Sequence, residues 1–556
     1  MTREKDLARR SAEIRKFFRS TPSDKTTVSQ FLHDVELEMK EYRAEVNRLK
    51  TTIYTIESKH DMLQKTAELY KTLFSPIHAV PSEVLTMIFA FLCEENVVSR
   101  STLPEVLRIS MVCGRWRDII YSTPSLWTGI KIDFCTWSKD FDVLHELTEH
   151  FLKWSGKSAL RLFLEFPDDD FGEGSAWKEA HSSLNALVAS CERWEALSLT
   201  LTPPQFPTTI FDAIRGRLPA LTSLALIQEG DLKIELPFNY FDGCPALCSL
   251  DITLSLVDPR QEALPLPWSQ IKHLQMSTAY NLRAFLWLSF FPAVENLEVH
   301  EIGGLDEGQD YADHVILSGI KTLTIASATE QDEVDGVLQH TTLSGILSLK
   351  IWGYWYRLRE EWPVWTETHL RNFLQRSSCN ITTLDLSHLP ITDEQMLSLL
   401  GIMPTVKSLR IEELRDEGEN RIVTKLFLDG LAIQASMKTP SSAPLVPCLA
   451  DMKLIIHAEN LHSDPFLRTL SSRWLPDPHV AAEIGVDCLR FVAIVVVLGS
   501  DEKGGHLNDL FCFKDAGMQL SITYGARSEL YFDNDDESEG GGDGENGEEG
   551  SGEESS

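Results

Sequence analysis

The residues of this sequence best suited to chemistry are histidines near carboxylates and cysteines that could act as nucleophiles. His300 next to Glu301, and His388 near Asp385, come closest to acid–base pairs. Cys113 lies among apolar residues expected on a helix face, whereas a nucleophilic thiol needs an exposed site that lowers its pKa. No Gly-rich phosphate loop, GxSxG elbow or HExxH motif occurs. These absences predict a protein that is not an enzyme and has no cofactor, and ten cysteines without a CxxC pair predict no metal site.

A second set of polar side chains alternates with apolar residues on short expected strands. Together they would form an extended surface suited to binding a protein. The apolar residues of such a strand point inward and the residues between them face outward. Seven outward positions are candidate substrate-binding residues: Glu298, His300, Lys350, Trp352, Asp385, Arg410 and Glu412. An aromatic group follows one of these strands and consists of Trp352, Tyr354, Trp355, Tyr356, Trp362 and Trp365. These rings either form an exposed binding hot spot or fill a small core beneath an inserted loop.

The short strands recur with a shared pattern, P-[AT]-[LV]-x-x-L-x-[LIV], from about residue 155. The clear copies begin at Pro219, Pro245, Pro292 and Pro404. Looser copies place a leucine at the equivalent position: Leu197, Leu274, Leu323, Leu349 and Leu384. Most intervals between successive repeat leucines match the period of ~20–29 residues that is typical of leucine-rich repeats. The pattern predicts a solenoid of short parallel strands over residues 155–530, with irregular late repeats.

Residues 28–75 have the apolar spacing of a coiled-coil helix. Apolar or weakly polar residues follow each other at alternating intervals of three and four, at Leu32, Val35, Met39, Tyr42, Val46, Leu49, Ile53, Ile56, His60, Leu63, Ala67, Tyr70 and Phe74. The stretch contains neither glycine nor proline. This helix either packs against its own chain or associates with a second copy.

Two shorter helices are expected after Pro76, which ends the coiled-coil helix. Pro81 opens the first, PSEVLTMIFAFL, since a proline at a helix start loses no hydrogen bond. Its apolar residues share one face: Val84, Leu85, Ile88, Phe89 and Leu92. A polar connection then leads to the second helix, LPEVLRISMVCGRWRDII, and TPSLW closes the unit.

Residues 76–130 resemble the F-box family, whose sequence elements occur here in order within about fifty residues. The first element is matched by Pro81, Glu83, Leu85, Ile88 and Phe89, with Val80 where the family usually has leucine. The later elements are matched by Val112, Cys113, Trp116, Arg117, Pro124, Leu126 and Trp127. The connection from Cys93 to Leu103 is longer than is usual in the family.

The resemblance implies a small all-α domain that docks on a Skp-type adaptor and, through it, on a cullin–RING ubiquitin ligase. The residues implied are divided between the adaptor-binding surface and the domain's own core: Pro81, Val84, Leu85, Ile88, Phe89, Leu92, Val112, Cys113 and Trp116. The chain would then be a non-catalytic subunit that presents an unknown substrate protein on its repeats for ubiquitination. The alternative is a scaffold protein that uses the coiled coil and the solenoid without a ligase.

Composition agrees with an α/β chain of several parts. A polar leader over residues 1–27 and an acidic tail over residues 533–556 are expected to be disordered. The formal net charge of -32 disfavours nucleic acid and anionic membranes as partners. Cysteines without a disulfide pattern, and an N-terminus without an apolar segment, favour a cytoplasmic or nuclear protein.

Overall fold

The computed structural model divides the chain into two compact units, Met1–Met87 and Ile88–Ser556, which are described separately. The described residues are 8–9, 11–12, 15–16, 25–72, 74–137, 140–166, 176–201, 208–228, 240–241, 243–253, 268–277, 287–300, 314–328, 331–353, 365–414, 422–433, 444–458, 461, 463–498 and 504–526. The expected acidic tail lies outside them, as does most of the expected leader.

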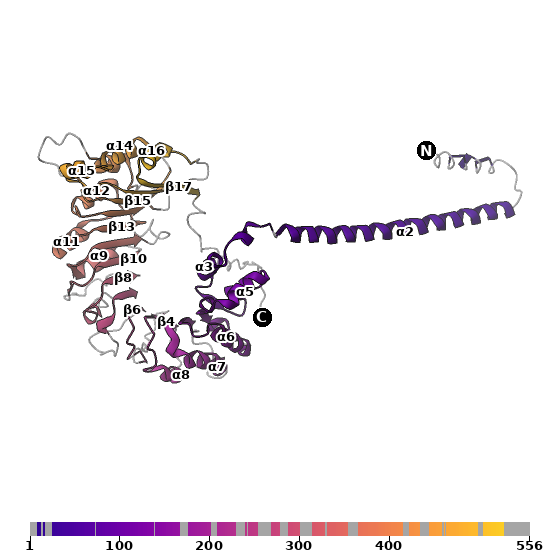
Figure 1. Ribbon diagram of the computed structural model, residues 1–556, viewed down its shortest axis with the longest axis horizontal. Coiled ribbons are helices and arrows are strands. Elements are labelled where there is room, and N and C mark those ends of the chain that lie inside the picture. Colours follow the sequence, from indigo (N-terminus) through magenta and orange to yellow (C-terminus); the bar gives the residue numbers. More distant parts are fainter. Residues whose placement is uncertain are drawn as a thin grey trace, which may run out of the picture. The chain divides into compact units, whose positions relative to one another are not determined.

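The segment expected to form a coiled coil is one uninterrupted helix, α2 (Lys25–Thr72), in the first unit (Figure 1). Its 48 residues include no glycine or proline, and its threonine hydroxyls, such as that of Thr52, bond back to carbonyl oxygens one turn earlier. Among the described residues, no single helix is long and apolar enough to cross a membrane; only the pair Val28–Ala79 and Ser82–Leu92 meets that criterion jointly.

Short helices follow at the positions that the prolines predict. The carbonyl oxygen of Pro81 accepts the first hydrogen bond of the next α-helix, from the Leu85 N–H at 3.1 Å. The elements of this segment are η1 (Pro76–Ala79), α3 (Ser82–Leu92), α4 (Glu105–Ser110), α5 (Gly114–Ser122) and η2 (Pro124–Trp127).

The connection between α3 and α4 contains a strand, so the expectation of an all-α segment over residues 76–130 is wrong at this point. Strand β1 (Asn96–Val98) pairs in parallel with β2 (Gly129–Asp133). Only glycine fits at Gly129, because a Cβ there would lie 1.9 Å from the Glu94 carbonyl oxygen. The close approach of these two backbones joins the helical segment to the sheet.

The second unit is built on a parallel sheet whose strands follow one another in chain order. Among the described residues it has 15 strands, which continue after β2 as β3 (Leu160–Glu165), β4 (Trp194–Leu201), β5 (Ser223–Gln228), β6 (Ser249–Thr253), β7 (His273–Ser277), β8 (Asn296–His300), β10 (Thr322–Ala328), β12 (Ser348–Gly353), β13 (Thr383–Ser387), β14 (Ser408–Glu412), β15 (Asp451–His457), β16 (Phe491–Leu498) and β17 (Gln519–Ala526). A second sheet pairs β9 (Val315–Leu317) with β11 (Thr341–Leu343). The large sheet begins before residue 155, where the repeats were expected to start.

The strand register places the repeat leucines opposite one another. Leu224 of β5, for example, pairs with Leu250 of β6, and Leu384 of β13 pairs with Leu409 of β14. The row comprises Leu197, Leu224, Leu250, Leu274, Leu297, Leu323, Leu349, Leu384, Leu409, Met452, Val492 and Leu520, all of them buried. Stacking in this way buries apolar faces that no single unit could bury alone.

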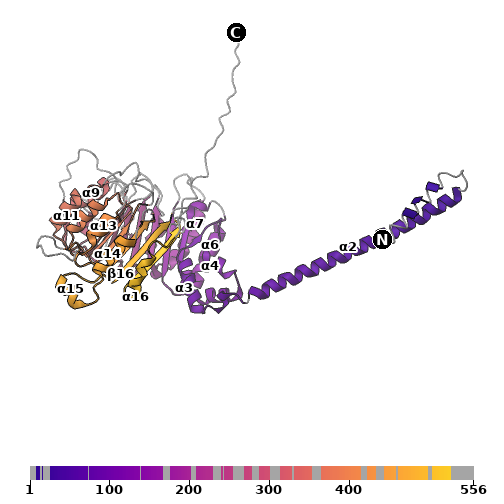
Figure 2. The ribbon, with the colours of Figure 1, turned by 90° about the horizontal axis from the view of Figure 1, so that it is seen from above.

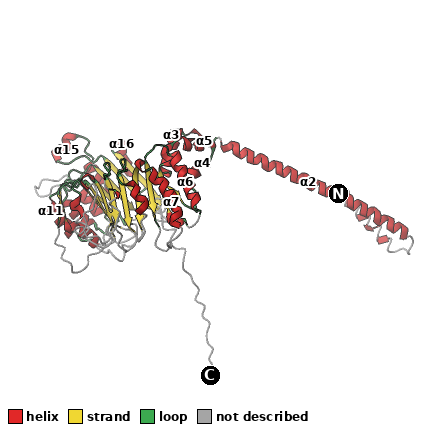
Figure 3. Ribbon diagram, turned by 90° about the horizontal axis from the view of Figure 1, so that it is seen from below, coloured by secondary structure: helices red, strands yellow, loops and turns green. Residues whose placement is uncertain are grey.

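Helices connect many of the strands, as parallel pairing requires a crossover between neighbours. In Figure 1 the helices of the second unit lie along the outer side of a curved sheet, and Figure 3 separates them from the strands by colour. They are α6 (Phe141–Trp154), α7 (Ala176–Ala189), α8 (Thr208–Phe211), α9 (Gln331–His340), α11 (Thr368–Ser377), α12 (Asp393–Gly401), α13 (Lys425–Leu431), α14 (Ser463–Arg473), α15 (Pro478–Ile484) and α16 (Phe511–Asp515).

Candidate functional site

Helix α3 has a buried apolar side and an exposed one. Leu85 and Phe89 are both 1% exposed, and the Phe89 ring packs on Trp116 of α5 with the ring centroids 4.8 Å apart. The opposite side leaves large apolar side chains in solvent, with Phe91 79% exposed. The exposed residues, at the helical spacing i, i+3, i+4, i+7 and i+8, are Val84, Met87, Ile88, Phe91 and Leu92. Such a stripe is typical of a helix that packs against a partner.

A second group of exposed apolar residues lies at the turn between α4 and α5. Met111 and Val112 are 65% and 62% exposed, and Leu103, just before α4, is 50% exposed. The expected position of Cys113 on a helix face is wrong, because its sulfur caps the start of α5 by accepting a hydrogen bond from the Trp116 N–H at 3.5 Å. We refer to these two groups in the second unit, Ile88, Phe91 and Leu92 on α3 and Leu103, Met111 and Val112 around α4, together as the apolar surface.

The structure separates the nine residues that sequence analysis assigned to this segment into surface and core. The exposed ones are Pro81, Val84, Ile88, Leu92 and Val112, the buried ones are Leu85 and Phe89, and Cys113 and Trp116 are half-buried. The exposed apolar residues that sequence analysis missed are Met87, Phe91, Leu103 and Met111. Met87 and Phe91 could have been found, since they continue the helical spacing of Val84 and Ile88.

The Asn96 side chain fixes the irregular backbone beside this surface. It is fully buried, and its Nδ2 shares two N–H donors among the carbonyl oxygens of Cys93, Leu126 and Gly129, at 3.1, 3.1 and 3.0 Å. Its Oδ1 accepts a hydrogen bond from the Val106 N–H at 3.0 Å. One amide group therefore joins the chain after α3, the end of η2, the start of β2 and the first turn of α4.

This segment is the part of the chain that a known family describes. Residues 77–133 match the F-box-like family model. The match covers η1 to β2, and so includes the whole of α3 and the apolar surface. It supports an F-box protein, and F-box domains typically bind Skp-type adaptors. A search of curated proteins found no match to the chain.

The seven candidate substrate-binding residues come together in two adjacent rows on one face of the large sheet. In the first row, Lys350 pairs with Asp385, which pairs with Arg410, and Glu298 lies in the same row beyond Thr324. Two residues further along each strand, Trp352 and Glu412 lie in a second row with Ser387 between them. His300 pairs with Ala326, just before the register shift between β10 and β12. Because side chains alternate along a strand, both rows face away from the buried leucines.

Three of these residues are held by one another. The Arg410 guanidinium lies 2.9 Å from Asp385 Oδ1 and 2.5 Å from Glu412 Oε2, and it also donates to Ser387 Oγ at 2.9 Å. His388 Nε2 lies 3.5 Å from Glu412 Oε1. The Arg410 guanidinium therefore pairs with the carboxylates of Asp385 and Glu412 and links strands β13 and β14.

A second polar group surrounds Asp251 on β6. The pKa of Asp251 is raised to about 6, mainly by burial; His300 opposes the shift, and the Glu298 carboxylate adds to it. Glu298 Oε1 and His300 Nε2 are hydrogen-bonded at 2.9 Å, and this bond lowers the pKa of Glu298. Farther along the row, the Lys350 ammonium lies 5.9 Å from the centroid of the Trp352 ring.

The raised pKa of Asp251 predicts a stability that falls as the pH rises from about 4 to about 6. Over that range the unfolded chain releases the Asp251 proton while the folded chain keeps it, so folding becomes less favourable. We expect Asp251→Asn to raise the free energy of unfolding by about 1–3 kcal/mol above pH 7 and to change it little near pH 4. Urea unfolding across this pH range measures the difference, with the exposed Asp515→Asn as the control. Parallel pH curves for Asp251→Asn and the unmodified chain would contradict the expectation.

Only the two ends of the aromatic group after β12 lie among the described residues. Trp365 is buried, and Trp352 is half-buried with its indole nitrogen enclosed. Tyr354, Trp355, Tyr356 and Trp362 lie outside the described residues. The two interpretations of this aromatic group therefore both stay predictions.

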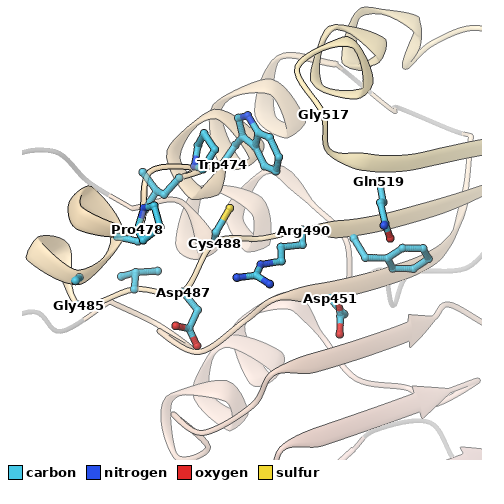
Figure 4. Close-up of a pocket in the computed structure, with 15 residues that line it drawn as sticks. Asp451, Trp474, Pro478, Gly485, Asp487, Cys488, Arg490, Gly517 and Gln519 are labelled. Atoms are coloured by element: carbon cyan, nitrogen blue, oxygen red, sulfur yellow. The ribbon is translucent and has the colours of Figure 1, made fainter.

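A cavity of about 740 Å³ lies beside α15 and the strands β15 to β17, and Figure 4 shows the residues around it. Its charged side chains are Asp451, Asp487 and Arg490, and it contains the Cys488 thiol. No histidine or lysine is among the described residues that line it. Elsewhere, burial raises the pKa of the Cys93 thiol to about 12, which disfavours the nucleophilic thiolate.

Proposed function

We propose that this chain is the substrate-recognition subunit of a cullin–RING ubiquitin ligase and is not itself an enzyme. The observation that carries the proposal is the apolar surface, which leaves Ile88 and Phe91 in solvent within the residues that match the F-box-like model. A surface of this kind is stable in water only at a cost, which contact with a partner removes. A Skp-type adaptor is the partner that the family match favours.

The sheet of the second unit is proposed to hold the substrate, as a leucine-rich-repeat solenoid. Support comes from the repeat interval, the aligned leucine row and the position of the helices along the outer side of the curved sheet. The polar rows from Glu298 to Glu412 lie on the side of the strands that faces away from the leucines. Both signs of charge occur there, so a substrate protein with a mixed polar surface fits better than a nucleic acid. A cytoplasmic or nuclear location is proposed with this function.

Binding of the full chain to a purified Skp-type adaptor tests the proposal. Titration calorimetry is expected to show one adaptor per chain with a dissociation constant near or below ~1 μM. Circular dichroism and a cooperative unfolding transition establish that the chain is folded in the same sample. A folded chain that binds no adaptor would overturn the proposal.

A further inference from the structure

Helix α2 presents a long apolar seam to solvent. At ~1.5 Å per residue its 48 residues extend about 72 Å, and Figure 2 shows the helix along its length. At the middle of the seam, Val46, Leu49, Ile53 and Ile56 are 48%, 47%, 53% and 60% exposed. Most of the stability of a helix in a protein comes from packing of its apolar face, so a seam of this length calls for a partner.

A helix that packs along the whole seam of α2 must carry an apolar stripe of the same length, with the same alternating interval of three and four residues. A second copy of α2 meets this requirement at every position. Counting Leu32 as heptad position a, the a positions include Met39, Val46 and Ile53, and the d positions include Tyr42, Leu49 and Ile56. When two copies of α2 lie side by side and in register, each seam residue packs against the identical residue of the other copy.

Charges beside the seam favour the parallel, in-register arrangement. In that arrangement each g residue faces the e residue five positions later on the other helix. Glu38 then faces Arg43 and Glu45 faces Lys50, and symmetry forms each pair twice. The Arg48 guanidinium lowers the pKa of Glu45, which keeps that carboxylate charged. None of the other g–e pairs brings like charges together: Phe31 with Glu36, Thr52 with Glu57, Lys59 with Gln64 and Thr66 with Lys71.

We propose that α2 forms a parallel, in-register, two-stranded coiled coil with a second copy of this chain. Parallel packing makes both chains leave the coiled coil at the same end, after Thr72. On the basis of the proposed function, the dimer carries two F-box-like domains and two sheets, and so offers two copies of each binding surface to an adaptor and a substrate.

The mass of the full chain in solution tests the dimer. Light scattering on the eluting protein at micromolar concentration is expected to give twice the chain mass of 62.8 kDa. Placing two carboxylates in the seam, as Ile53→Asp/Ile56→Asp, is expected to weaken association about 100-fold or more and give the single-chain mass. The matched control is Leu37→Asp/Tyr54→Asp, which changes two exposed apolar residues of the same helix outside the seam and should leave the dimer intact.

Charge reversal tests the parallel register. Glu38→Lys/Glu45→Lys and Arg43→Glu/Lys50→Glu are each expected to weaken the homodimer, because like charges then face each other on both sides of the seam. An equimolar mixture of the two variants should restore a two-chain particle that contains one copy of each. A monomeric unmodified chain, a particle of three or more chains, or a mixture that fails to pair would overturn the proposal. None of these readouts requires the adaptor, so they remain informative if adaptor binding fails.

Discussion

Replacing Ile88 and Phe91 by aspartate is expected to weaken binding to a Skp-type adaptor about 100-fold or more. Both side chains already lie in water in the free chain, at 45% and 79% exposed, so their replacement leaves no cavity. In the complex the new carboxylates would be buried against apolar residues without a partner, which strongly disfavours association. The free energy of unfolding of the isolated chain should change by less than ~1 kcal/mol. Calorimetric titration and urea unfolding measure the two quantities.

The matched control is Val143→Asp/Ile316→Asp, which makes the same kind of change at two exposed positions outside the F-box-like match. This control should bind the adaptor as the unmodified chain does. Leu85→Ala serves a different purpose, because Leu85 is buried and its loss should lower the free energy of unfolding by about 2–5 kcal/mol. Equal adaptor affinity for the Ile88/Phe91 variant and the unmodified chain would exclude this surface as the docking site.

Asn96→Ala is expected to lower the free energy of unfolding by about 3–5 kcal/mol, a large effect for the loss of one uncharged polar side chain. The change removes four hydrogen bonds and leaves three carbonyl oxygens and the Val106 N–H without their partner. Their surroundings are buried, so replacement bonds to water would be few. Urea unfolding gives the loss directly.

The exposed Asn380 provides the comparison for Asn96, since the same Asn→Ala change there should alter the free energy of unfolding by less than ~0.5 kcal/mol. Because Asn96 joins the backbone at the end of α3 to β2, its loss should also weaken adaptor binding at temperatures near the transition. A loss below ~1 kcal/mol for Asn96→Ala would show that these four bonds do not hold the segment.

Sequence periodicity predicted the elements whose residues repeat regularly. The interval of three and four residues identified α2, and the spacing of leucines from Leu197 to Leu409 identified strands that the structure aligns in one row. The prolines at 76 and 81 fixed where α2 and α3 are separated. Each of these patterns involves residues that are close together in the chain, so it can be recognised in a single sequence.

Features that depend on contacts between segments far apart in the sequence could not be predicted from such local patterns. Strand β1 has three residues and exists because β2 lies beside it, and the contacts of Asn96 reach as far as Gly129. Arg473 is buried and donates to the carbonyl oxygens of Leu431, Val446 and Leu445, and burial lowers its pKa to about 10. Nothing in the local sequence distinguishes such an arginine from one at the surface.

In the candidate sites too, local patterns predicted some features and only the packing of the structure revealed others. The alternation of polar and apolar residues placed Asp385 and Arg410 on one face, but only the strand register shows that they are paired to each other. On α3, both Leu85 and Ile88 fit the family pattern, and only packing shows that the first is core and the second is surface.

Reconstitution of the full chain with a Skp-type adaptor and a cullin–RING complex tests the proposed ligase function. We expect the chain, the adaptor and the cullin to elute as one complex, and the Ile88→Asp/Phe91→Asp variant to be absent from it. A chain that binds the adaptor but excludes the cullin would contradict the ligase assignment and favour a scaffold protein. A folded chain that binds neither would contradict the role of the F-box-like segment itself.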